Sequence, residues 1–249
     1  MLTNQQGSVL QRVTHWLAIL PCRVQRNVYK KLPVVDKHIV YYELRTALKT
    51  GSCAICDLVV RASERRLRFL FHECINDPGV RSELRASLGF CPRHASVIVH
   101  LGNALGIAIL YHDMVNQARI RLSYTNTRAP LRAVCPECAS EMEDERRYTR
   151  ALASDLRDAE MQGAYAAGAG LCVGHLEEVV AQSGSEVLVF LRAQEEAKLG
   201  RLEWELGEFI RKTDYNYSHE PMEDERNSWL RALAKVAGCA LCTDQGHER

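Results

Sequence analysis

The residues of this chain that could do chemistry are concentrated in four cysteine and histidine pairs. A CxxC pair is followed after 34 residues by a CxxH pair, and a second CxxC pair is followed after 33 residues by a second CxxH pair. In chain order the pairs are Cys53 and Cys56, Cys91 and His94, Cys135 and Cys138, and Cys172 and His175. This alternation at nearly equal spacing indicates two metal sites.

Two residues between ligands let the chain form a tight knuckle that turns both side chains toward one ion, and zinc favours tetrahedral sets of three cysteines and one histidine. We expect one zinc on Cys53, Cys56, Cys91 and His94, and a second on Cys135, Cys138, Cys172 and His175. Four protein ligands leave no position for water, which is typical of structural rather than catalytic zinc.

The sequence leaves alternatives to structural zinc open. An iron–sulfur cluster is the main alternative to zinc, although such clusters usually take four cysteines. Cys135-Pro-Glu-Cys138 is similar to a dithiol redox motif, but that motif normally begins a helix after a strand, and no such strand is expected here. An enzyme or redox carrier that uses the metal centres, or a groove between the repeats, is therefore the alternative to a binding or scaffold module.

The composition is ordinary for a globular protein, with 47% hydrophobic and 25% charged residues. The formal net charge of +1 provides no general attraction for nucleic acid or an anionic membrane. No apolar run approaches the roughly 18 residues of a membrane span. With no secretion signal and with six of the ten cysteines in the four CxxC and CxxH pairs, we expect reduced thiols in the cytoplasm.

Apolar residues recur with helical spacing along most of the chain, and no stretch alternates with the period of a strand, so the predicted fold class is all-α. A helix is expected before Leu48, and a long amphipathic helix after Cys56 that ends before Asn76-Asp77-Pro78-Gly79. The last long helix carries its apolar stripe at Leu199, Leu202, Leu206, Phe209 and Ile210.

The chain contains an internal duplication. A shift of 81 residues places Glu64-Arg65-Arg66 on Glu145-Arg146-Arg147 and each CxxH pair on the other, and a shift of 82 superimposes the CxxC pairs. We therefore predict two duplicated helical units, each organised around its own site. The predicted division is a basic N-terminal arm (1–35), a first unit (36–128), a second unit (129–212) and a C-terminal helical extension (213–249).

Both ends of the chain carry further features. Residues 1–35 contain five basic and no acidic residues, and Val9, Val13, Trp16, Leu17 and Leu20 form an amphipathic stripe. This arm either packs on the body or touches an anionic membrane surface. At the other end, Cys239 and Cys242 form a third CxxC pair with only His247 nearby. From spacing alone we expect this pair to hold no metal and to be partly exposed.

Several stretches resemble a family of uncharacterised prokaryotic proteins known only as a domain of unknown function. They are Asn76–Arg81, Gly89–His94, Gly106–Tyr111 and Asp214–Trp229, and the resemblance covers about residues 36–238. It implies the duplicated CxxC and CxxH pattern but no activity. The residues therefore favour a zinc-binding helical scaffold with an unidentified protein partner.

Overall fold

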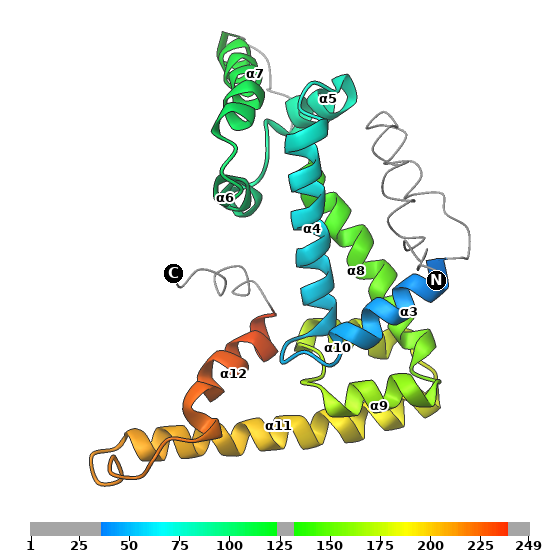
Figure 1. Cartoon of the computed structure of the whole chain (residues 1–249), viewed down its shortest axis with the longest axis vertical. Coiled ribbons are helices and arrows are strands. Elements are labelled where there is room, and N and C mark those ends of the chain that lie inside the picture. The colour runs from blue at the N-terminus through cyan, green and yellow to red at the C-terminus, as the bar shows by residue number, and fades with distance from the viewer. Residues whose placement is uncertain (1–35, 124–131, 239–249) are drawn as a thin grey trace, which may run out of the picture. The chain divides into compact units, whose positions relative to one another are not determined.

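The computed structural model describes residues 36–123 and 132–238, and every regular element in these ranges is a helix (Figure 1). The all-α prediction is confirmed. The predicted N-terminal arm and the C-terminal cysteines lie outside the described residues. Within the described ranges, no helix combines the length and apolarity needed to span a bilayer.

The described helices, with a single 3-10 turn η1, follow in this order: α3 (Asp36–Ala47), α4 (Ala54–Glu73), α5 (Pro78–Ser87), α6 (Pro92–His100), α7 (Ala104–Ser123), α8 (Pro136–Asp155), α9 (Ala159–Ala167), α10 (Val173–Gln182), α11 (Ser185–Thr213), η1 (Asp224–Asn227) and α12 (Ser228–Ala237).

The predicted helix boundaries have local causes. Asp77 accepts a hydrogen bond from the Val80 amide at 2.9 Å, and Pro78 occupies the first turn, so α5 begins at the predicted break. Leu88 then ends α5 in the left-handed conformation, with φ 54°. At α9, the Asp158 carboxylate accepts hydrogen bonds from the amides of Glu160 and Met161.

The described chain forms two compact units, which do not follow one another along the sequence. The first takes residues 66–136, and the second takes residues 37–65 together with 137–238. Each therefore combines segments from both sequence repeats, and the division falls inside α4. The predicted boundaries at residues 128 and 212 describe the repeat along the chain and stay a prediction.

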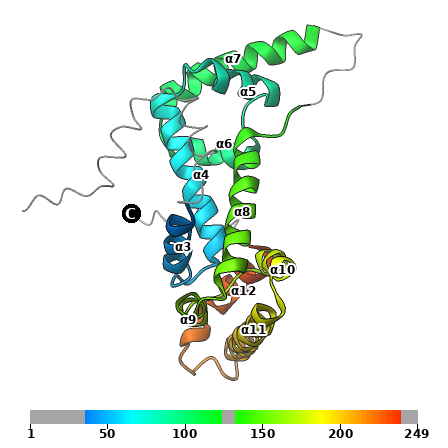
Figure 2. The ribbon, with the colours of Figure 1, turned by 90° about the vertical axis from the view of Figure 1, so that its right-hand side faces the viewer.

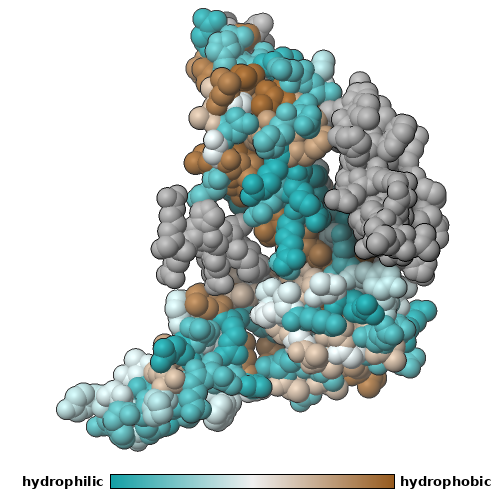
Figure 3. Space-filling view, in the orientation of Figure 1, coloured by the Kyte–Doolittle hydropathy of each residue, from teal (hydrophilic) through white to brown (hydrophobic). Residues whose placement is uncertain are grey.

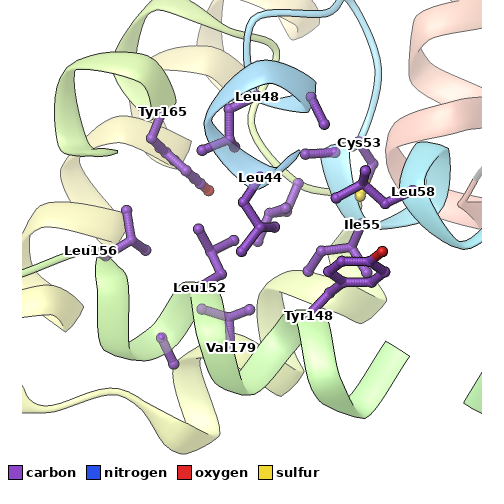
Figure 4. Close-up of a cluster of buried hydrophobic side chains, with 14 of the residues drawn as sticks. Leu44, Leu48, Cys53, Ile55, Leu58, Tyr148, Leu152, Leu156, Tyr165 and Val179 are labelled. Carbon is purple, nitrogen blue, oxygen red and sulfur yellow. The ribbon is translucent and has the colours of Figure 1, made fainter. Parts of the chain in front are cut away.

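The second unit has the larger core. Figures 1 and 2 both show α9, α10 and α11 around the C-terminal half of α8. The close-up in Figure 4 shows side chains of α3 and α4 meeting those of α8, α9 and α10. The largest buried members are Leu44, Leu48, Ile55, Tyr148, Leu152, Leu156, Met161, Tyr165, Val179 and Leu191. Cys53, Cys56 and Cys172 belong to the same cluster.

The first unit has a smaller core formed by the C-terminal part of α4 with α5, α6 and α7. Its buried members are Leu67, Leu70, Phe71, Cys74, Val80, Leu84, Ile98, Leu110 and Met114. These positions repeat at three and four residues along each helix, as the sequence pattern predicts.

Gly168 allows the backbone after α9 to approach the end of α3 very closely. A Cβ atom placed on Gly168 would lie 1.7 Å from the carbonyl oxygen of Leu48. Backbone atoms cannot move aside as a flexible side chain can, so we expect Gly168→Ala to destabilise the fold by about 1–3 kcal/mol. Thermal or denaturant unfolding measures the change.

The matched control is Gly163→Ala in α9, where a Cβ would meet nothing within 4 Å. Because alanine is the better helix former, this variant should gain about 0.5–1 kcal/mol. Equal stabilities of the two variants would contradict the close approach at Gly168.

Candidate metal centres

All four pairs lie at helix starts. Cys91 and Cys172 occupy the N-cap positions of α6 and α10, and the histidine of each CxxH pair lies in the following first turn. The CxxC pairs occupy the same places at α4 and α8, which begin directly after Cys53 and Cys135. The unsatisfied amides and the positive end of the helix dipole stabilise thiolates at these positions.

The structure brings the eight residues together as two groups of four. The first cluster contains Cys53, Cys56, Cys172 and His175, and the second contains Cys91, His94, Cys135 and Cys138. In each group the candidate ligand atoms all lie within 4.8 Å of one another. All six cysteines are thiols rather than halves of disulfides. Two Cys3His sets are therefore present.

This grouping corrects the predicted assignment of pairs. Each CxxC pair was expected to meet the CxxH pair that follows it in the same repeat, whereas Cys53 and Cys56 meet Cys172 and His175 instead. The reason lies in α4, whose 20 residues cover about 30 Å and lead the chain away from Cys56. The ten-residue α5 packs against α7 instead of returning to the start of α4.

The first cluster has the dimensions of a tetrahedral zinc site. The Nδ1 atom of His175 lies 3.4 Å from the Sγ atom of Cys53, 3.3 Å from that of Cys56 and 3.2 Å from that of Cys172. The Sγ atoms of Cys56 and Cys172 are 3.8 Å apart. Ordinary zinc–ligand bond lengths in a tetrahedron imply separations of about 3.5 Å and about 3.8 Å. The residues fit the ion.

The second cluster has a similar geometry. The Nδ1 atom of His94 lies 3.2 Å from the Sγ atom of Cys91 and 3.6 Å from that of Cys135. Cys138 lies in the same first helical turn as Cys135. His94 and Cys135 are buried, whereas Cys91 and Cys138 are partly exposed. This cluster is therefore more accessible than the first, whose four residues are all buried.

The protein without metal already favours charged ligands in the first cluster. Hydrogen bonds with Cys53 and Cys56, and further bonds with His175, outweigh burial and hold the pKa of the Cys172 thiol far below its usual value. Burial lowers the pKa of His175, but hydrogen bonds with Cys172, Cys53 and Glu145 raise it to about 12. A metal ion would displace the imidazolium proton and take over the stabilisation of the Cys172 thiolate.

A carboxylate lies behind the histidine of the first cluster. The Oε1 atom of Glu145 on α8 is 3.8 Å from the Nε2 atom of His175, on the opposite side of the ring from the thiols. Metal-bound histidines commonly donate their second N–H group to such a carboxylate, which fixes the tautomer that presents Nδ1 to the ion. Glu145 belongs to the Glu-Arg-Arg motif that repeats at Glu64.

A buried polar network supports the segment before Cys172. The carboxylate of Glu195 on α11 accepts hydrogen bonds from the Tyr165 hydroxyl and from the Leu171 amide, and it pairs with the ammonium of Lys235 on α12. Sequence reasoning missed these residues. The spacing contained one signal. Val187, Leu191 and Glu195 are four residues apart, so Glu195 lies on the same buried face of α11 as the two apolar residues.

The chain thus defines a class of all-helical protein in which two closed Cys3His sets join helix starts. A model of a family of unknown function, DUF6062, matches it twice, over residues 35–155 and 121–242, and the chain belongs to this family. The double match supports the predicted duplication. No curated protein and no solved structure matches the chain.

The observed grouping is open to a direct test. In the zinc-loaded protein, Cys53→Ser should expose Cys172 to alkylation while Cys91 and Cys135 stay protected, because the first cluster alone loses a ligand. Peptide mass spectrometry after iodoacetamide treatment measures this. Exposure of Cys91 in place of Cys172 would support the sequential grouping and contradict the structure.

Replacing the outer carboxylate should weaken the first site without destroying it. We expect Glu145→Gln to lower zinc affinity there by about 10–100-fold, because the amide supports the His175 tautomer less strongly. Competition with a chromophoric chelator measures the affinity. Glu143→Gln, an exposed position on the same helix, is the control and should leave the affinity unchanged.

Proposed function

We propose that the protein is a cytoplasmic, zinc-stabilised helical module that binds a protein partner and carries no catalysis of its own. One observation carries the zinc proposal: two sets of three cysteines and one histidine converge at zinc-like separations. Four protein ligands complete the coordination of the ion, and closed sites of this kind are structural.

Structural zinc in the first cluster would link two parts of the fold. It would join the start of α4 to the start of α10, whose first residues, Ala54 and Val173, are more than 100 positions apart in the chain. A structural zinc site can contribute on the order of 10 kcal/mol of apparent folding free energy. The ion would extend the core formed by Cys53, Cys56, Cys172 and their apolar neighbours.

Support for a protein partner comes from α12, which is turned with its apolar side outward. Trp229, Leu233 and Val236 are exposed, whereas Ser228 and Lys235 on the same helix are buried. Further large apolar side chains are exposed on α11, and Figure 3 shows apolar surface on the visible face near α6 and α7. Exposed apolar residues that gather on one element are typical of interaction surfaces.

The near-zero formal charge argues against nucleic acid as the partner, since such proteins usually carry a basic stripe. A membrane contact through the basic arm remains a proposal that concerns residues 1–35, outside the described part. The cytoplasmic location is supported by the six cluster cysteines, which are thiols suited to a reducing compartment.

Elemental analysis of protein purified without added metal tests this function. We expect two zinc ions per chain, and removal of zinc by a chelator should lower both the helical circular dichroism signal and the unfolding temperature. Iron with a visible charge-transfer absorption would instead support the iron–sulfur alternative. A metal-free protein with unchanged stability would contradict both.

A further inference from the structure

The end of α12 lies against the first metal cluster. Gly238 follows α12 with φ +77°, a conformation that favours glycine. A Cβ atom placed on Gly238 would lie 3.7 Å from the Sγ atom of Cys172 and 3.9 Å from that of Cys56. The backbone that leaves α12 therefore passes within van der Waals distance of two of the four candidate ligands.

A buried carboxylate connects α12 to the segment that leads into Cys172. The Glu195 carboxylate on α11 pairs with the ammonium of Lys235, near the end of α12, and it accepts a hydrogen bond from the Leu171 amide at 3.2 Å. Gly170 permits this approach, because its φ is +80° and a Cβ atom there would lie 2.2 Å from the Oε1 atom of Glu195. Loss of α12 would leave the Glu195 charge buried without its cation, beside the backbone that carries a candidate ligand.

Charged side chains attach α12 to α11. The buried residues of α12 are Ser228 and Lys235, both polar. Arg231 provides a second ion pair, with its Nη1 atom 2.6 Å from the Oε2 atom of Glu205, a residue of α11 whose side chain is 1% exposed. The large apolar side chains of α12 contribute less, because three of the four are exposed. A helix held by so little apolar surface can leave its unit without unfolding the core.

Metal binding at the first cluster requires the same backbone conformation. The thiolate of Cys172 joins the other ligands when the backbone at Leu171 holds its place, and a bound ion would fix that place in turn. The pair of Lys235 and Glu195 stabilises the same segment from the side of α12. Two events that favour one conformation are linked, and each raises the equilibrium constant of the other by the same factor.

We propose that metal binding at the first cluster is coupled to the attachment of α12, so that the metal-free protein releases this helix. The inference rests on the proposed metal binding. In the loaded protein, the exposed apolar stripe of Trp229, Leu233 and Val236 belongs to a helix that is fixed to its unit. After loss of the ion, the same stripe belongs to a segment that can leave. The first cluster thereby regulates the surface that supports a protein partner.

The substitution Arg231→Glu tests the coupling from the side of α12. It places a carboxylate against that of Glu205, which keeps its ion pair with Arg201, so α12 is released without leaving a buried charge alone. Arg231 lies seven residues before Gly238, or about 10 Å along the chain, so it acts on the cluster only through the helix. We expect zinc affinity at the first cluster to fall by roughly 5–50-fold and affinity at the second to stay unchanged.

Alkylation at buffered zinc concentrations separates the two sites, because protection of Cys172 reports the first cluster and protection of Cys91 the second. The matched control is Arg226→Glu, the same change at an exposed arginine of η1, which should leave both affinities unchanged. Wild-type protein that contains no zinc would contradict the proposed function itself. Equal zinc dependence of Cys172 protection in the wild type and in Arg231→Glu would overturn the coupling alone.

Hydrogen exchange in the wild type tests the reverse direction without a substitution. On removal of zinc, the amides of α12 should lose protection, whereas those of α8 around Tyr148 and Leu152, in the larger core, should stay protected. Added zinc should restore the protection of α12. Unchanged exchange in α12 would overturn the proposal, and so would loss of protection in both helices together, because the ion would then hold the whole unit.

Discussion

The second unit depends on one constraint, which is that the four candidate ligands of its cluster come from two segments far apart in sequence. Cys53 and Cys56 must meet Cys172 and His175, and the Cys53–His175 contact closes a separation of 122 residues. Closing such a loop costs conformational entropy that grows with the logarithm of its length. Burial of the surrounding core offsets part of that cost, because three of the candidate ligands are members of the core, and a bound metal ion would add to it at the same place.

The candidate ligands are positioned first by the helix starts and then by the side chains around them. Helix starts place the thiols where backbone dipoles favour their charged form. Around them, Glu145 faces the outer nitrogen of His175, and Glu195 holds the Leu171 amide that precedes Cys172. The buried Glu195 tolerates its desolvation because a hydroxyl, an amide and the Lys235 ammonium all face its carboxylate. Removing one of these partners would therefore disturb the first cluster, because Glu195 holds the backbone segment that leads into Cys172.

Sequence reasoning succeeded where the interaction is local and failed where it depends on topology. The helices, the break at Asn76–Gly79 and the duplication are confirmed, and the eight Cys and His residues gather in two groups that could hold a metal, because each feature follows from spacing within one turn or one repeat. The assignment of pairs was wrong because both CxxC pairs have the same donors and nearly the same distance to a CxxH pair. Only the length of α4 and the core formed by Leu44 and Tyr148 distinguish the alternatives, and neither appears in a ligand motif.

This equivalence of donors has a physical consequence for duplicated metal sites in general. Any two CxxC pairs offer an ion the same bonds, so coordination chemistry alone cannot select between them. Selection must come from the chain that carries each pair. In this protein Cys53 and Cys56 begin a helix within the larger core, and the Leu171 amide directly before Cys172 is held by the buried Glu195 carboxylate. The packing of these segments, and not the coordination chemistry, decides which CxxC pair meets Cys172 and His175.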